Sequence, residues 1–443
     1  MSAPLPRPHL SDDGREILRL AVPALGALVA EPLYVLADTA VVGHLGTGPL
    51  GGLGVASAAL LFAYGLCIFL AYGTTASVAR LTGAGEHRRA ADQAVQGLWL
   101  ALGIGIGLAA VGIPLADSIV GALGADGDVA DHATTYLRIS LLGAPGMLLM
   151  LAGVGYLRGL KDNVRPLRVA VGTAILNLVL ELVLILGLDL SIGASAAATV
   201  VAQWTGAAYY LAWVGRDVRR RRASLGPHPA NIVRMLTVSG QLLVRNLSLT
   251  GMFLVGTSVA TRIGRDDVAA HQVAFQVWVA AALAMDAVAI AAQAMVGERL
   301  GAGDAAAARR IGCRVIAWSV AMGLAMLPVL LATRHGVAGV FSADAQVVSL
   351  AAFLLVHVAL MAPVGGIAFA LDGILIGAGD QAFMARAMAA TSVATVAAMV
   401  VGRLADLGVG WLWGAIWLAT VLRSGIFLTR FAGDRWQVVG AER

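Results

Sequence analysis

Long apolar segments follow one another along almost the whole of this 443-residue chain and are separated by short polar loops. A transmembrane helix needs about 20 consecutive apolar residues, whereas a transmembrane strand alternates over about ten. The pattern therefore predicts an all-α polytopic membrane protein. We expect twelve transmembrane helices, at residues 14–42, 49–78, 92–115, 130–157, 164–187, 191–215, 233–262, 267–297, 308–332, 345–377, 383–404 and 409–431.

Basic residues gather in alternate loops. Most of the 31 lysine and arginine residues lie in the N-terminal segment, in the loops near 80–89, 158–168, 216–234 and 299–314, at 386 and at 430–443. The loop at 116–131 holds four aspartates and no basic residue. Because basic loops stay on the cytoplasmic side, we expect both termini in the cytoplasm and a multi-pass protein of the cytoplasmic (inner) cell membrane. This rule also accounts for the net charge of +5, so we expect a lipid bilayer and no nucleic acid as partner.

The chain resembles itself at an ungapped shift of 218 residues. TAVVGHLG from Thr39 aligns with TSVATRIG from Thr257, and GAGE from Gly83 aligns with GAGD from Gly301. Each repeat holds six predicted helices, an even number, so the repeats share one orientation and a pseudo-twofold axis along the membrane normal. We expect an N-lobe at 1–215, a cytoplasmic linker at 216–232 and a C-lobe at 233–443, with a central cavity as in alternating-access transporters.

Polar residues lie on one face of the first predicted helix. Glu31, Tyr34 and Asp38 are spaced i, i+3, i+7, which places them on the same side. A carboxylate in the hydrocarbon costs several kcal/mol, so such residues face the interior of a bundle. Pro23 lies before this stripe and Pro32 within it, and either proline allows the helix to bend.

Further polar pairs lie on the fifth and sixth predicted helices. Asn177 and Glu181 are spaced i, i+4, as are Thr199 and Gln203. If these faces converge on Asp38, they form a cluster of oxygen atoms. Such a cluster holds a proton shared between two acids, or a Na⁺ ion bound by Asp38, Asn177, Glu181 and Thr199. Interhelical hydrogen bonds that serve only packing are the alternative.

The second half has a different polar set. Asp286 and Gln293 are spaced i, i+7 on the eighth predicted helix, and Asp372 lies within the tenth. Arg245 and Asn246 lie on the seventh, where either is able to pair with one of these acids. The set therefore belongs either to a substrate cavity or to a structural Arg–Asp pair.

Several sequence motifs of enzymes are missing from the chain. It has no GxxxxGK[ST], HExxH or GxSxG motif, and these motifs carry nucleotide binding, zinc hydrolysis and serine nucleophiles. We therefore expect no enzyme and no cofactor. An active transporter of this kind takes its energy from an ion gradient.

Three segments give the chain a resemblance to a known family. LADTAVVGHLG at 36–46, the GAGE and GAGD loops, and LDGILIGAGD at 371–380 resemble the multidrug and toxic compound extrusion (MATE) transporters, and their DinF-like branch most. The resemblance covers essentially the whole chain. It implies a V-shaped pair of six-helix lobes that expels cationic or amphipathic compounds in exchange for H⁺ or Na⁺.

The resemblance also assigns roles to residues. Asp38, Asn177 and Thr199 match a cation-coupling cluster, in which Glu181 replaces a second aspartate, and Pro23 matches a helix-bending proline. Glu31 has no counterpart in that pattern. The remaining matches to the family concern the substrate cavity, and they are Tyr34, Tyr136, Asp286, Asp372 and Gln293, the last in place of a glutamate. To the same cavity we also assign Glu31, Gln203, Arg245 and Asn246.

These observations together predict a secondary active multidrug exporter that works as an antiporter and as a monomer. The alternative is a flippase for a lipid-linked or other amphipathic metabolite, with a related two-lobe architecture. A flippase of that kind is expected to have several cationic residues inside its cavity. Only Arg245, Arg138 and Arg423 lie within the predicted spans as candidates, so we rank the exporter first.

Overall fold

The computed structural model describes residues 12–441, and the ends of the two predicted lobes, at 1–11 and 442–443, lie outside it. Across the described range the chain is helical and contains no strand. The elements are α1 (Asp12–Gly43), α2 (Thr47–Leu66), α3 (Phe69–Gly83), α4 (His87–Gly112), α5 (Ala116–Ala122), α6 (Gly127–Leu141), α7 (Ala144–Gly159), α8 (Val164–Glu181), the π-helical turn η1 (Leu182–Gly187), α9 (Ile192–Arg221), α10 (Pro229–Ile263), α11 (Arg265–Gly301), α12 (Ala305–Phe341), α13 (Ala345–Gly377), α14 (Gln381–Leu404) and α15 (Gly408–Ala432).

Most predicted spans meet the length and hydropathy expected of a transmembrane helix. Among the described residues, 10 helical segments do so, and the bent pair α6–α7 brings the number to 11. The remaining predicted span is the sixth, at 191–215, which corresponds to α9. It is less apolar because Ser195, Thr199 and Gln203 interrupt a stretch rich in alanine. α9 nevertheless packs against α6, α7 and α8 within the bundle, so its polar residues face other helices.

Two predicted helices are interrupted in the structure. The helix predicted at 49–78 is divided into α2 and α3 at Cys67 and Ile68. The backbone N–H groups of these two residues donate to the carbonyls three residues earlier, at Tyr64 and Gly65, instead of the carbonyls four residues earlier as in an α-helix. The helix predicted at 130–157 bends by 51° between α6 and α7, where Pro145 lacks the backbone N–H of a continuous helix. The short helix α5 was not predicted.

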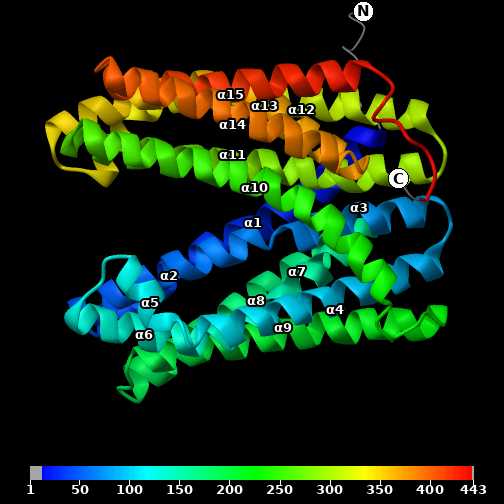
Figure 1. Cartoon of the computed structure of the whole chain (residues 1–443), viewed down its shortest axis with the longest axis horizontal. Helices are drawn as coiled ribbons and strands as arrows, with labels where there is room; N and C mark the ends of the chain where they lie inside the picture. Colours follow the sequence, from blue (N-terminus) through cyan, green and yellow to red (C-terminus); the bar gives the residue numbers. More distant parts are fainter. Residues whose placement is uncertain (1–11, 442–443) are drawn as a thin grey trace, which may run out of the picture.

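The chain forms two lobes (Figure 1), and the 218-residue repeat is visible as matching contacts in both. In the N-lobe, Gly155 of α7 lies against the backbone of Ala71 in α3. In the C-lobe, Gly373 of α13 lies against the backbone of Ala289 in α11, at the equivalent positions. Small residues let two helix backbones approach closely inside a membrane. The sequence repeat is therefore a repeat of helix crossings.

The two lobes touch where α3 and α11 end. Gly83 lies against the backbone of Glu298, and Gly301 lies against the backbone of Arg80. Both pairs obey the 218-residue shift, so the pseudo-twofold axis passes between these two helix ends. Figure 1 shows the described N- and C-terminal residues on this side, while the bundles diverge toward α5 and α6. We call the side where α3 meets α11 the closed end.

Ion pairs reinforce the closed end. The ammonium group of Lys161 lies 2.8 Å from Glu16 of the N-lobe and 2.6 Å from Glu298 of the C-lobe. Burial lowers the pKa of Lys161, but its hydrogen bonds to the two carboxylates outweigh burial and hold that pKa above its usual value. Arg314 also pairs with Asp13 across the lobes. Lys161 therefore stays charged in its bridge.

The C-terminal segment after α15 crosses the closed end. Gly440 donates from its backbone N–H to the carbonyl of Leu300, at 2.9 Å. Arg80 of α3 donates to the carbonyls of Val438 at 2.6 Å and Gly440 at 3.0 Å. The indole of Trp436 is fully buried. The segment thus binds both α3 of the N-lobe and α11 of the C-lobe.

Candidate functional site

A cavity of about 240 Å³ lies inside the N-lobe. α1 contributes one wall, and α2, α6, α7, α8 and α9 contribute the others. Of the residues predicted from the sequence, this cavity is lined by Glu31, Tyr34, Asp38, Tyr136, Asn177, Thr199 and Gln203. Glu181 lies behind the wall with no exposed surface. Pro23 lies in α1 on the side toward the closed end.

Four polar residues in and behind this wall form a continuous hydrogen-bond chain. The Tyr34 hydroxyl lies 2.8 Å from the hydroxyl of Thr199. The Asn177 amide oxygen accepts from the backbone N–H of Thr199 at 3.0 Å and from its hydroxyl at 3.1 Å. The Asn177 amide nitrogen donates to Oε1 of Glu181 at 2.9 Å. This orientation of the Asn177 amide follows from its neighbours, because Thr199 offers hydrogen-bond donors and Glu181 offers an acceptor. The predicted faces of α1, α8 and α9 thus converge.

Asp38 joins this chain through a residue that sequence reasoning missed. The hydroxyl of Ser195, on α9, lies 2.8 Å from Oδ1 of Asp38 and 3.3 Å from Oε1 of Glu181. The Tyr136 hydroxyl donates to the other oxygen of Asp38 at 3.4 Å. Ser195 precedes Thr199 by one helical turn, so the same spacing that selected Thr199 and Gln203 extends to it. We call Asp38, Asn177, Glu181, Ser195 and Thr199 the acid cluster.

The acid cluster contains two carboxyl groups and no positive partner. Among the described residues, neither Asp38 nor Glu181 forms an ion pair, and Oε2 of Glu181 has no hydrogen-bond partner. Asp38 is 4% exposed and Glu181 is 0% exposed. Two neighbouring buried carboxylates repel each other and both lose hydration. A bound proton or a bound cation removes this cost.

The equivalent positions of the C-lobe carry no acid. Under the 218-residue shift, Asp38 aligns with Gly256, Glu181 with Met399 and Ser195 with Trp413. The Met399 side chain lies over Gly256, and Trp413 is fully buried in the same apolar core. The acid cluster is therefore a property of one lobe.

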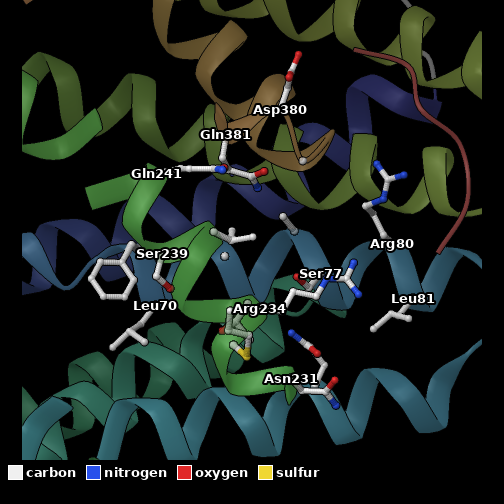
Figure 2. Close-up of a pocket in the computed structure, with 18 of the residues that line it drawn as sticks. Leu70, Ser77, Arg80, Leu81, Asn231, Arg234, Ser239, Gln241, Asp380 and Gln381 are labelled. Atoms are coloured by element: carbon white, nitrogen blue, oxygen red, sulfur yellow. The ribbon is translucent and has the colours of Figure 1, made fainter. Parts of the chain in front are cut away.

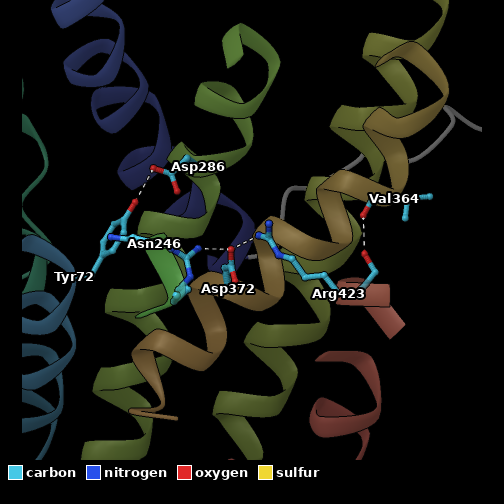
Figure 3. A network of polar contacts seen from close by, with 8 residues as sticks. Tyr72, Asn246, Asp286, Val364, Asp372 and Arg423 are labelled. Carbon is cyan, nitrogen blue, oxygen red and sulfur yellow. Dashed lines mark hydrogen bonds and ion pairs between the residues drawn. The ribbon is translucent and has the colours of Figure 1, made fainter. Parts of the chain in front are cut away.

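The C-lobe has its own charged network, shown in Figure 3. Asp372 of α13 accepts from Arg245 of α10 at 2.6 Å and from Arg423 of α15. Arg245 also donates to the side-chain oxygen of Asn246 at 2.8 Å. Asp286 of α11 accepts from the hydroxyl of Tyr72, which belongs to the N-lobe, at 3.5 Å. The predicted Arg–Asp pair is present, with Arg423 as a second partner for the acid.

A cavity of about 300 Å³ lies beside this network. Arg245 and Asp286 line it together with the aromatic rings of Phe253, Phe275 and Trp278. Asp372, Asn246 and Gln293 are buried and are not among its lining residues. The backbone of Gln293 lies instead against Gly377, at a crossing of α11 and α13.

Replacement of Asp372 by alanine is expected to destabilise the C-lobe. The change leaves two buried guanidinium groups without their shared carboxylate, and loss of one partner from a buried ion pair costs about 3–5 kcal/mol. Thermal unfolding of the purified protein in detergent measures the loss. Asp286→Ala is the control, because among residues 12–441 the Asp286 carboxylate accepts a single long hydrogen bond, from Tyr72. An equal loss in both variants contradicts a special role of the Asp372 pair.

Comparisons with known proteins agree with this architecture. The profile of the family described as MatE matches residues 23–183 and 242–401, and these two blocks correspond to the two repeats. The chain is 31% identical to Protein DETOXIFICATION 44, chloroplastic, of Arabidopsis thaliana, over 94% of the chain and 82% of that protein. It is 30% identical to DNA damage-inducible protein F of Escherichia coli (strain K12), over 97% of the chain and 94% of that protein.

The fold also resembles solved structures. One is described as the outward-facing conformation of a multidrug resistance MATE family transporter of the MOP superfamily. It superposes with a TM-score of 0.86 at 22% identity and covers 95% of this chain and 96% of its own. At this identity the likeness concerns the fold.

Proposed function

Because this chain belongs to the MatE family, we propose that it is a secondary active exporter, which exchanges amphipathic or cationic small molecules for protons by alternating access. The acid cluster carries this proposal. A relative is named as a probable multidrug resistance protein, NorM of Thermotoga maritima, which supports small molecules as cargo. We further propose that the closed end faces the cytoplasm and that the structure represents the outward-facing state.

The geometry of the acid cluster favours a proton over Na⁺ as the coupling ion. The oxygen of Asn177 already accepts two hydrogen bonds from Thr199, and the Thr199 hydroxyl also lies next to Tyr34. These two oxygens are therefore bonded within the protein, which leaves Asp38, Glu181 and Ser195 as ligands. A hard cation takes about six oxygen ligands. Ser195 has a single hydroxyl hydrogen, so it donates a hydrogen bond to either Asp38 or Glu181 at any one time. A proton bound to the other carboxyl group removes the remaining negative charge.

Protonation of the acid cluster is proposed to change the shape of α1. With its charge removed, the segment of α1 that carries Tyr34 and Asp38 no longer needs a polar, hydrated cavity. Pro23 interrupts the backbone hydrogen bonds of α1 between the closed end and this segment. A bend at Pro23 then narrows the N-lobe cavity and displaces the substrate outward, and release of the proton on the opposite side resets the transporter.

Transport in proteoliposomes tests the proposal. Export of a fluorescent organic cation is measured under an imposed pH gradient and, separately, under an imposed Na⁺ gradient. We expect the pH gradient to drive export and the Na⁺ gradient to fail. Export that follows only the Na⁺ gradient assigns the acid cluster to Na⁺, and export under neither gradient contradicts secondary active antiport.

Replacement of Ser195 by alanine is expected to lower pH-driven export about tenfold, because a hydrogen bond to a charged group contributes about 1.5–3 kcal/mol. Ser195→Thr retains the hydroxyl and should retain most of the rate. The measurement is the initial export rate at several values of the pH gradient. Equal rates for Ser195→Ala and the unsubstituted protein contradict a role for Ser195 in positioning the two acids.

The flippase alternative has some support in the C-lobe, where Arg245 and Arg423 lie beside a cavity. Both guanidinium groups bind Asp372, however, and Arg138 pairs with Asp117 at the surface, at 2.7 Å. The cationic residues therefore have acidic partners within the protein. An exporter agrees better with this arrangement.

A further inference from the structure

The segment that follows α15, residues 434–441, connects the two lobes at the closed end, and we call it the strap. Figure 2 shows Arg80 of α3 with the strap, in red, beside it. The strap borders a cavity of about 600 Å³, which is lined by Arg80 of the N-lobe and by Ala441 of the strap. The strap therefore lies away from the acid cluster and from the C-lobe network.

The strap begins on the C-lobe, where it is held firmly. Trp436 is fully buried, and its indole stacks on Phe431 of α15 with the ring centroids 5.1 Å apart and donates to the Phe431 carbonyl at 3.0 Å. Arg309 of α12 donates to the carbonyl of Gly433 at 2.8 Å and to the carboxylate of Asp434 at 2.9 Å. These contacts all lie within the C-lobe, so the first part of the strap moves with that lobe.

The last part of the strap reaches the N-lobe. Arg80, which is buried, donates through one terminal nitrogen to the carbonyls of Val438 and Gly440. Its other terminal nitrogen donates to the carbonyl of Ala378, at the end of α13, at 2.9 Å. Ala441 packs at the edge of an N-lobe core, whereas the side chain of Val438 is 41% exposed. This part of the strap is therefore tied to the N-lobe chiefly through the guanidinium group of Arg80.

We propose that the strap is a latch on the closed end, which has to release Arg80 before the lobes separate on this side. When α3 moves away from α11, Arg80 moves with α3, while Trp436 keeps the strap on the C-lobe. The hydrogen bonds from Arg80 to the carbonyls then break, and a buried charged donor that loses its acceptors is costly. The latch thus stabilises the state in which the closed end is formed. This inference rests on the alternating access proposed above, but not on the choice of ion or substrate.

Gly440 is a point at which the latch is broken without a change in packing. Its φ of 111° belongs to a region that residues with a side chain rarely adopt, and nothing lies within 4 Å of a side chain built there. Valine at this position therefore strains the backbone that presents a carbonyl to Arg80 and an N–H group to Leu300. Gly433 is the matched control, because its backbone is extended (φ −80°, ψ −177°) and an added side chain meets its nearest atom at 3.8 Å, an ordinary contact.

Single-molecule energy transfer on the full-length chain in nanodiscs tests the proposal. Dyes are attached at His87→Cys and Ala306→Cys, two exposed positions at the starts of α4 and α12, after the exposed Cys313 is replaced by serine. We expect Gly440→Val to raise the ratio of open to closed molecules about tenfold, because backbone strain of this kind shifts an equilibrium by that order. Gly433→Val should leave the ratio unchanged.

Arg80→Lys tests the other partner of the latch. A lysine keeps the charge, but its ammonium group does not reproduce the planar fork with which Arg80 reaches three carbonyls. The variant should raise the ratio as Gly440→Val does, and the two substitutions together should raise it no further, because they break the same contact. Additive effects, or an equal rise in Gly433→Val, overturn the latch. An unchanged ratio in Gly440→Val overturns the latch and leaves alternating access standing, whereas the lack of open molecules in every variant contradicts both.

Discussion

Replacement of Asp38 by asparagine is expected to abolish export driven by a pH gradient, to the rate of liposomes without protein. The asparagine keeps the size of the side chain and a hydrogen-bond acceptor for Ser195, but it takes up no proton. The acid cluster then has one carboxyl group left, Glu181, and no pair of acids to share a proton. Substrate binding should persist, because the cavity keeps its shape. The initial export rate and the equilibrium binding of the same fluorescent cation are the two measurements.

Glu31→Gln provides the matched control. Glu31 lies on the same helix face and lines the same cavity, but no hydrogen bond connects it to the acid cluster within the described part of the chain. The variant removes one carboxylate from the cavity without touching the two coupled acids, and it should retain proton-driven export. If Asp38→Asn exports at the full rate under a pH gradient, the assignment of the coupling site is wrong. If Glu31→Gln abolishes export instead, the coupling residue is Glu31, which lies about two helical turns before Asp38 on the exposed part of α1.

Replacement of Gly83 by valine is expected to hold the lobes apart at the closed end. A side chain at this position overlaps the backbone of Glu298, and a helix backbone does not move aside as a flexible side chain does. Overpacking of this kind costs about 1–3 kcal/mol, and every 1.4 kcal/mol changes a population about tenfold. The state with the closed end formed should therefore be depleted by about fivefold to a hundredfold, and export should slow in proportion.

Distances between spin labels measure this shift. Arg88 and Arg310 are exposed residues on the two lobes near the closed end, and the exposed Cys313 is first replaced by serine. Gly301→Val should give the same lengthening of the distance as Gly83→Val, because the two glycines are related by the pseudo-twofold axis. Gly107→Val is the control, since nothing lies within 4 Å of a side chain built there. An unchanged distance in both Gly83→Val and Gly301→Val shows that this contact does not control closure.

The architecture of the chain was predicted from its sequence because two signals in it are strong. Apolar length predicts the spans, and the ungapped repeat predicts two lobes of one orientation, which the matching glycine contacts reproduce. The interruptions were not predicted for a physical reason. The division of α2 from α3 at Cys67 and Ile68 involves apolar residues that suit a helix as well as a turn, and only the packing of neighbouring helices selects the turn.

The acid cluster could be inferred in part. Helical spacing places Asp38, Glu181 and Thr199 on defined faces, and the cost of burying acids points those faces inward, but the contact between faces requires the tertiary structure. Ser195 belonged to the same helical stripe and was overlooked. The C-lobe network is harder to foresee, because Arg423 and Asp372 lie on separate helices and no spacing rule connects them. The role of each of these residues in transport remains a prediction.

The bridge formed by Lys161 gives the molecule a natural chemical reporter. It is the one lysine in the whole sequence, and its amine is held between Glu16 and Glu298, which belong to different lobes. A protonated, doubly paired amine reacts poorly with acylating reagents, whereas separation of α1 and α11 at this end releases it to water. Apart from the α-amino group, acylation of the unmodified protein therefore has a single target side chain, and its rate follows the opening of the lobes without any introduced label.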